Sequence, residues 1–298
     1  MESSRSPISS GRQGRAPAVG VDLGATLTKI AQRDHEGRYH LELMPSRAVD
    51  PIVAKVSALG PASIGLTGGG AARLANLLEL PSHTVAEFDA WGAGADRLLD
   101  PELIAQGSRY LLVSLGTGTS VLLIDGGRAV RVGGTALGGG TVLGLGSALT
   151  GANSFEELCL LASKGSRRHV DLVVSDIYSS GELPLPGDLT AASFGKLGLT
   201  PEASDPSSAD TDGKSPEHLA AAIMGLVGEN VALICGGLAA ATQAETIVFG
   251  GSTLRSNPAL VTVLEGVTAM IGRNAHFLPD GEFGGALGAL ELARNGAP

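Results

Sequence analysis

The chain is short of aromatic side chains, of cysteine and of positive charge, and each shortage excludes a class of protein. Phe, Trp and Tyr make up only 3% of the 298 residues, so aliphatic side chains must fill the core. The net charge of −9 lacks the basic surface that binds a nucleic-acid backbone. The two cysteines, Cys159 and Cys235, lie in apolar runs without CxxC or HExxH patterns, which predicts buried thiols rather than a disulfide or zinc site.

Two segments of the chain are considered as a possible signal peptide and a possible membrane-spanning helix. Residues 1–17 hold Ser, Gly, Arg and Pro, which predicts a disordered tail without the apolar centre of a signal peptide. Leu219 to Ala241 is apolar and long enough to span a bilayer. Glu229 and Asn230 lie at its centre, however, where a charge is costly in lipid. We therefore expect a buried helix and a cytoplasmic protein without a membrane partner.

Glycine is abundant, and its positions indicate a duplicated architecture. The 44 glycines mark turns and close approaches rather than a repeat. From Ala18 onward the patterns predict three hairpin-linked strands and then alternating helices and strands, and a second three-strand unit begins at Tyr110. This order predicts an α/β fold with two similar domains, residues 18–106 and 107–298, each a mixed sheet covered by helices and facing the other across a cleft.

Some expected elements determine where candidate residues lie. We expect a strand over Thr84 to Phe88 and a helix over Asp89 to Leu99, with Asp89 as the helix N-cap. Helices are also expected over Thr141 to Leu149, Phe155 to Ser163 and Val170 to Ile177.

Two glycine-containing loops occupy equivalent places in the two halves. In the first loop, Asp22 to Lys29, an acid at a strand end suits Mg²⁺ bound through water, and Lys29 can reach a β- or γ-phosphate. The second loop runs from Gly116 to Ser120. Either loop alone is also compatible with an ordinary polar hairpin. Two such loops that face each other can clamp a triphosphate.

Two further glycine turns are candidates for nucleotide contacts. Gly138 to Gly140 opens an expected helix, and the exposed N–H groups of a helix start bind phosphate. Gly250 to Ser252 follows a buried strand, where the backbone can pass a nucleobase or ribose. A plain strand-to-helix turn explains the second pattern equally well.

Together these motifs resemble the type II pantothenate kinases, within the superfamily of actin-like ATPases and sugar kinases. The resemblance is carried by VGVDLGATLTKI (Val19 to Ile30), IGLTGGGA (Ile64 to Ala71), EFDA (Glu87 to Ala90), SLGTGTSV (Ser114 to Val121), RVGGTALGGGTVLGLG (Arg131 to Gly146), PGDLTAASFG (Pro186 to Gly195), MGLVGE (Met224 to Glu229), FGGS (Phe249 to Ser252) and GEFGGALGAL (Gly281 to Leu290). It implies two RNase H-like domains of the actin-like ATPase type. It also implies a homodimer that phosphorylates pantothenate with ATP and Mg²⁺, the first step of coenzyme A biosynthesis.

The resemblance also implies roles for individual residues. Glu87 would be the base that accepts the proton of the pantothenate primary hydroxyl. Asp89, two residues further on, is the competing candidate for this role, although the N-cap position explains it better. Arg131 would stabilise the transferring phosphoryl group and contact pantothenate, although a surface ion pair is its alternative. Ser120 matches a position near pantothenate. Positions around ATP are matched by Asp22, Gly24, Thr26, Lys29, Thr117, Gly139, Gly140, Thr141, Phe155 and Ser252. Phe155 is equally compatible with core packing.

The sequence departs from the family pattern at two positions, and two other functions stay open. Ala25 replaces a more usual glycine, so its methyl group would crowd the γ-phosphate or demand a different φ. Gly284 stands where serine is common. One alternative is a sugar-type kinase of the same superfamily, which would present an Asp base and often a zinc cluster. The other is a non-catalytic regulator that binds ATP or a coenzyme A thioester.

Overall fold

Two five-stranded sheets organise the protein, which is described here by a computed structural model for residues 17–100, 109–179, 182, 187–199 and 214–296. The predicted tail lies outside the described residues except for Pro17. The first sheet has the order β3 (Tyr39–Pro45), β2 (Leu27–Arg33), β1 (Ala18–Leu23), β4 (Ser63–Thr67) and β5 (His83–Thr84). The second sheet has the order β8 (Arg128–Thr135), β7 (Thr119–Asp125), β6 (Tyr110–Leu115), β11 (Thr246–Gly250) and β12 (Asn274–Phe277).

The two sheets share one topology. In each, three antiparallel strands form a meander, a fourth strand pairs parallel with the first strand of that meander, and a fifth strand pairs parallel with the fourth. The prediction of two similar mixed sheets is thus confirmed. The boundary between residues 106 and 107 stays a prediction.

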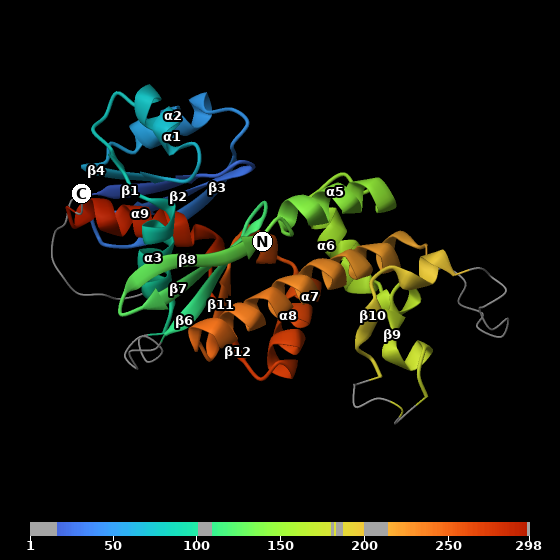
Figure 1. The fold of residues 1–298 in the computed structure, drawn as a ribbon. Helices are drawn as coiled ribbons and strands as arrows, with labels where there is room; N and C mark the ends of the chain where they lie inside the picture. Colours follow the sequence, from blue (N-terminus) through green and yellow to red (C-terminus); the bar gives the residue numbers. More distant parts are fainter. Residues whose placement is uncertain (1–16, 101–108, 180–181, 183–186, 200–213, 297–298) are drawn as a thin grey trace.

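Helices lie on both faces of each sheet, so that the molecule is built in layers (Figure 1). Helices α1 (Asp50–Ala58) and α2 (Ala71–Leu77) share a core with one face of the first sheet. The central layer holds α3 (Glu87–Leu98) and α9 (Gly284–Arg294). The outer face of the second sheet packs on α5 (Gly139–Thr150), α6 (Phe155–Lys164), α7 (Pro216–Thr242) and α8 (Pro258–Met270).

The alternation of side chains along β1 and β6 explains these layers. In β1, Val19 and Val21 lie in the core with α1 and α2, whereas Ala18 faces α9 on the opposite side. In β6, Val113 lies in the core with α7, whereas Leu112 packs against α3. Because successive residues of a strand point to opposite faces, each strand supplies both layers at once. The polar residue near the end of each strand then points into the space between the sheets.

Helix α9 lies far from the first sheet in sequence but packs directly on it. A Cβ atom at Gly20 of β1 would overlap the Ala286 carbonyl oxygen. On its other side α9 meets α3, and a Cβ atom at Gly288 would overlap the Ala90 carbonyl oxygen. The helix is therefore held in backbone contact with its neighbours on two sides, at places where only glycine fits.

We expect Gly288→Ala to lower the free energy of unfolding by about 1–3 kcal/mol or more, because the added methyl group has no space between α9 and α3. The matched control is Gly144→Ala in α5, where a Cβ atom would meet nothing within 4 Å. That change should stabilise the protein by roughly 0.5–1 kcal/mol through the helix preference of alanine. Urea unfolding of both variants measures the difference, and equal stabilities would contradict the close packing.

Two expected elements are wrong. The strand over Thr84 to Phe88 is only β5, and α3 already begins at Glu87, so the predicted N-cap Asp89 lies inside the first turn and Ala86 takes the N-cap position. Acidic side chains in a first turn are favourable even without a side-chain cap. The segment Val170 to Ile177 is not a helix.

Local side-chain hydrogen bonds explain the irregular segment around Asp171. The Phe194 N–H donates to the Asp171 carboxylate at 2.8 Å, and the Val173 N–H donates to Asp176 at 2.9 Å. Such bonds compete with helical ones. The segment instead forms 3₁₀ turns at Arg167–His169 and Val174–Asp176 and the strand β9 (Leu172–Val173), which pairs with β10 (Thr190–Ala192).

Helix α7 is long and apolar enough to cross a membrane by length and composition, but 67% of its most apolar window is buried inside the protein. The carboxylate of Glu229, at the centre of the helix, also has hydrogen-bond partners inside the protein. Arg167 donates to the Glu229 carboxylate at 2.6 Å, and the Thr190 hydroxyl donates to it at 2.8 Å. These contacts agree with a core helix.

Candidate active site

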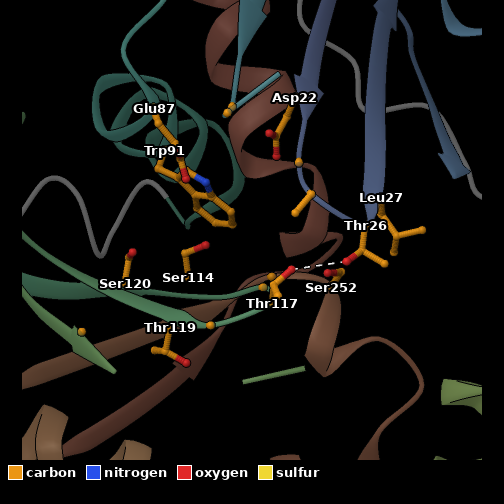
Figure 2. A pocket seen from close by; sticks show the side chains of 18 of the residues that line it. Asp22, Thr26, Leu27, Glu87, Trp91, Ser114, Thr117, Thr119, Ser120 and Ser252 are labelled. Atoms are coloured by element: carbon orange, nitrogen blue, oxygen red, sulfur yellow. Dashed lines mark hydrogen bonds between the residues drawn. The ribbon is translucent and has the colours of Figure 1, made fainter. Parts of the chain in front are cut away.

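A cavity of about 640 Å³ lies between the two sheets, where the first loop, the second loop, the start of α3 and the turn at Ser252 meet (Figure 2). It brings together most of the predicted site residues. Those that line it are Asp22, Gly24, Thr26, Lys29, Glu87, Thr117, Ser120, Arg131 and Ser252.

The first loop places a buried ion pair on the cavity wall. Asp22 and Lys29 lie directly opposite each other in the β1–β2 ladder, and the Lys29 Nζ is 3.5 Å from Asp22 Oδ2. Both residues are almost fully buried, so their charges interact strongly with whatever enters the cavity. Ala25 is exposed and has a φ in the ordinary region for L-residues. The effect of its methyl group on φ and on the γ-phosphate stays a prediction.

The second loop faces the first across the cavity. It is a tight turn in which the Gly116 N–H donates to the Gly118 carbonyl at 2.9 Å, leaving Thr117 exposed at its tip. The Thr117 hydroxyl lies 3.4 Å from the Thr26 hydroxyl, a contact drawn as a dashed line in Figure 2. The two loops thus approach from opposite sheets with hydroxyl groups at their tips, as a triphosphate clamp requires.

The triple glycine at the start of α5 supports the second loop from behind. The Gly139 N–H donates to the Gly116 carbonyl at 2.8 Å, and the Gly140 N–H donates to the Thr117 carbonyl at 2.9 Å. The expectation that these two amides are free for phosphate is therefore wrong. A Cβ atom at Gly138 would lie 2.7 Å from the Gly118 Cα, so glycine allows the helix to press against the loop.

Four residues assigned to ATP from the family resemblance do not line the cavity. Gly139, Gly140 and Thr141 lie at the start of α5, where the Thr141 hydroxyl donates to the Ala136 carbonyl at 3.2 Å. Phe155 packs against the core beneath the second sheet, in agreement with the alternative of core packing. Their assignment to the nucleotide stays a prediction.

Glu87 is the first residue of α3 and reaches the cavity from the helix start. Partial burial raises the pKa of its carboxyl group above the ordinary value of 4.5, and the negative Asp22 raises it further. The nearby Lys29 ammonium opposes this rise. A carboxylate with a raised pKa holds a proton more readily, which suits a base that must take one from an alcohol.

The raised pKa predicts the acidic limit of activity. Glu87 accepts a proton only when ionised, so kcat/KM should be lost as the pH falls through the raised pKa, at a midpoint above 4.5. A pH profile of kcat/KM measures this midpoint, with circular dichroism at each pH to show that the protein stays folded. A midpoint at or below 4.5 would contradict the assignment.

Arg131 and Ser120 meet on the opposite wall. Arg131 lies on β8 beside a register shift between Val121 and Leu122. Its Nη2 atom lies 2.9 Å from the place where a Cβ atom at Gly134 would stand, and Gly134 is the ladder partner of Ser120. Among the residues that the structure describes, Arg131 forms no ion pair. The alternative of a surface ion pair therefore does not hold within that part of the chain.

Trp91 and Ser114 are among the residues of the cavity wall that sequence reasoning did not single out. Trp91 follows Glu87 by four residues, one helical turn, so it shares a face with the glutamate. From the sequence the helix is expected to begin at Asp89, so the spacing of Glu87 and Trp91 along one helix is not predicted. Ser114 occupies the second-last position of β6, and Asp22 occupies the same position in β1. The duplication of the two halves could therefore have indicated Ser114 as a site residue.

Magnesium fits the site as an ion held chiefly by the nucleotide. The described residues contain no group of three or more His, Cys, Asp or Glu side chains arranged to hold a metal. Asp22 presents one carboxylate at the cavity wall. Mg²⁺ usually keeps several waters and binds one or two carboxylates together with substrate phosphates, so this donor set is sufficient.

Comparisons of sequence identify close relatives. The chain is 36% identical to a type II pantothenate kinase of Staphylococcus haemolyticus over 277 residues, which cover 92% of this chain and 99% of the relative. It is 37% identical to a type II pantothenate kinase of Oceanobacillus iheyensis over 273 residues, which cover 91% and 98%. A family model described as Fumble matches residues 105–291.

Comparisons of structure show the fold. Component A of the (R)-2-hydroxyglutaryl-CoA dehydratase of Acidaminococcus fermentans is similar with a TM-score of 0.62 at 15% identity, over 95% of this chain and 99% of that one. A ROK family glucokinase from Streptomyces griseus, solved with glucose and AMPPNP, is similar with a TM-score of 0.58 at 13% identity, over 94% of this chain and 99% of that one. At these identities the similarity supports a common two-sheet architecture and nothing finer.

Proposed function

The chain belongs to the type II pantothenate kinase family, and on that premise we propose that Glu87 and Arg131 are the residues with which it phosphorylates pantothenate. The reaction transfers the γ-phosphoryl group of ATP to the primary hydroxyl of pantothenate, the first step toward coenzyme A. One observation carries the assignment of residues. A carboxylate with a raised pKa and an arginine without an ion pair among the described residues line the same cavity as two facing hydroxyl-tipped loops.

The two loops are proposed to hold the triphosphate. Thr26 and Thr117 offer hydroxyl donors from opposite sides, and the backbone at Gly24 and Gly118 permits close approach. Lys29 adds a positive charge that neutralises phosphate oxygens. Its pairing with Asp22 keeps the ammonium fixed before the nucleotide arrives, so little ordering is needed on binding.

Asp22 is the residue proposed to hold Mg²⁺, through water. The ion supplies neutralisation of charge on the β- and γ-phosphates when it is bound. The remaining work falls to the side chains of the chain itself. Asp22 orients the water molecules around it, because its carboxylate is fixed between Lys29 and the backbone at Gly68.

Glu87 and Arg131 are proposed to act on the transfer itself. Glu87 accepts the proton of the acceptor hydroxyl as that oxygen bonds to the γ-phosphorus, and the bond from the γ-phosphorus to the bridging oxygen breaks to release ADP. Negative charge grows on the equatorial oxygens of the moving group. The Arg131 guanidinium, held near Ser120, stabilises that charge. Ser120 is proposed to contact pantothenate.

The nucleoside part of ATP is proposed to lie beyond the cavity wall at Ser252. This turn lines the cavity and contacts the second loop, because the Thr253 hydroxyl donates to the Gly116 carbonyl at 2.9 Å. It also lies against the start of α5, where a Cβ atom at Gly139 would lie 2.6 Å from the Thr253 hydroxyl oxygen. Gly139, Gly140, Thr141 and Phe155 would then lie on the path of the ribose and base.

A homodimer and a cytoplasmic location belong to the same proposal. Support for the dimer comes from an exposed apolar strip on α7, where Leu233 and Ile234 are 51% and 37% exposed. A Cβ atom at Gly237, one turn further along, would meet nothing within 4 Å. An exposed strip of leucine, isoleucine and glycine suits close packing against a second copy.

Leu233→Glu is expected to convert the dimer into a monomer, because it places a charge in the centre of this strip. The control is Leu160→Glu on α6, where the leucine is 56% exposed but lies outside the strip. Light scattering after size-exclusion chromatography gives the mass of each variant. A dimer of unchanged strength in Leu233→Glu would place the interface elsewhere.

The experiment that tests the proposed function is a coupled assay of ADP release with pantothenate and a panel of small sugars. We expect turnover that depends on pantothenate and on Mg²⁺. Turnover with a sugar instead would make the protein a sugar-type kinase. Binding of ATP without turnover of any acceptor would make it a non-catalytic relative.

A further inference from the structure

Trp91 is the one tryptophan of the chain, and it lies in the wall of the active-site cavity. It belongs to α3, one helical turn after Glu87, and Figure 2 shows both side chains on the same helix at the cavity. The side chain is only 5% exposed. It is thus a nearly buried group that borders the same cavity as Glu87.

The indole ring is fixed from behind by glycine. A Cβ atom at Gly284 would lie 3.0 Å from Cζ3 and 3.1 Å from Cε3, and one at Gly250 would lie 3.3 Å from Cζ3. The absence of a side chain at Gly284 therefore makes room for Trp91, and the two residues form a matched pair in this chain.

The opposite edge of the ring carries an unused hydrogen-bond donor. Nε1 lies 3.3 Å from the point where a Cβ atom at Gly285 would stand, and Asp22 Oδ2 lies 3.0 Å from the same point. Among the residues that the structure describes, none accepts a hydrogen bond from Trp91 Nε1. This nitrogen is also not one of the fully inaccessible polar atoms without a partner, so part of its surface remains accessible. A donor of a nearly buried side chain that lacks a protein acceptor and borders a cavity is available to a ligand.

We propose that Trp91 determines specificity in the acceptor subsite: Gly284 and Gly250 clamp its benzo edge, and its Nε1–H donates a hydrogen bond to an oxygen of the acceptor. The inference rests on the proposed function, because it needs an acceptor bound beside Glu87. Trp91 and the proposed base Glu87 lie one turn apart on the same helix and line the same cavity, so a ligand oxygen that accepts from Nε1–H can belong to the acceptor bound beside that base. The KM for pantothenate, compared with the KM for ATP, measures which substrate makes the contact.

Two substitutions separate the donor from the ring. Trp91→Phe keeps an aromatic ring but removes the N–H, and should raise the KM for pantothenate about 3- to 10-fold, the range of one net hydrogen bond. Trp91→Ala also opens the wall and should raise it further. For Trp91→Phe, kcat and the KM for ATP should stay within about twofold of wild type. A matched control is Tyr110→Phe, which removes a hydroxyl from the same apolar cluster away from the cavity and should leave all constants unchanged.

Gly284→Ser tests whether the close contact between Gly284 and the indole ring of Trp91 fixes the position of that ring. A side chain at this position displaces the indole, so the KM for pantothenate should rise as in Trp91→Phe. In Trp91→Ala the displaced ring is absent, so adding Gly284→Ser to that variant should cause no further rise. A further rise in the double variant would contradict the pairing of the two positions.

Fluorescence gives a readout that does not depend on turnover. Because Trp91 is the only tryptophan, its emission should change when pantothenate is added to the wild type already saturated with a non-hydrolysable ATP analogue and Mg²⁺. Unchanged emission, or a wild-type KM for pantothenate in Trp91→Phe, would overturn the inference while the proposed function stands. A wild type that never turns over pantothenate would overturn both.

Discussion

Glu87→Gln is expected to lower kcat by about 10²- to 10⁴-fold, the usual contribution of a general base. The amide has the size of the carboxylate but cannot accept the proton of the acceptor hydroxyl. Nucleotide binding should stay close to that of the wild type, because the two loops, and not α3, are proposed to hold the triphosphate. The coupled assay measures kcat, and calorimetry with a non-hydrolysable ATP analogue measures binding.

The control for Glu87 is Asp89→Asn. Asp89 lies two residues further along α3, where it lines a separate cavity with Asp96 and Arg128. Its loss should change kcat by less than about twofold. Substantial turnover in Glu87→Gln, or an equal loss in Asp89→Asn, would remove Glu87 as the base.

Arg131→Ala is expected to lower kcat by about 10²- to 10³-fold, because the charge that grows on the transferring phosphoryl group loses its fixed cation. The KM for ATP should change far less, since Lys29 and the loop hydroxyl groups remain. Arg131→Lys should recover only part of the rate, because an ammonium group lacks the planar fork of a guanidinium.

Arg128→Ala is the matched control for Arg131. Arg128 begins the same strand, is exposed, and lines the separate cavity beside α3. It removes the same charge from the same strand without touching the active-site cavity. If both variants lose activity equally, the effect is one of net charge, and an unchanged kcat in Arg131→Ala would show that Arg131 is structural.

Local patterns in the sequence carried enough information for the meanders and the loops. The pairing of Asp22 with Lys29 and the turn at Gly116 to Thr119 depend on neighbours within a few residues, so that alternation and glycine placement predict them.

Interactions between distant residues explain what the sequence did not reveal. No residue near Gly139 in the sequence indicates that its N–H donates to the carbonyl of Gly116, which lies in the hairpin of β6 and β7. The start of α3 at Glu87 could not be predicted, because Ala86 provides no side-chain cap. The position of Glu87 and Trp91 on one face of that helix could therefore not be predicted either. The contact of Gly284 with Trp91 joins residues that are far apart in the chain.

The position of α9 also has a consequence for biosynthesis. Ala18 and Ala31 of the first sheet are buried against Phe283, Ala286 and Leu287, which the ribosome adds long after it has added β1 and β2. One apolar face of these two strands therefore stays uncovered until α9 has been synthesised. Long-range contacts of this kind slow folding and expose nascent chains to aggregation. We expect nascent chains stalled before α9 emerges to depend on chaperones, and the packing of α9 on the first sheet to commit the protein to its native state.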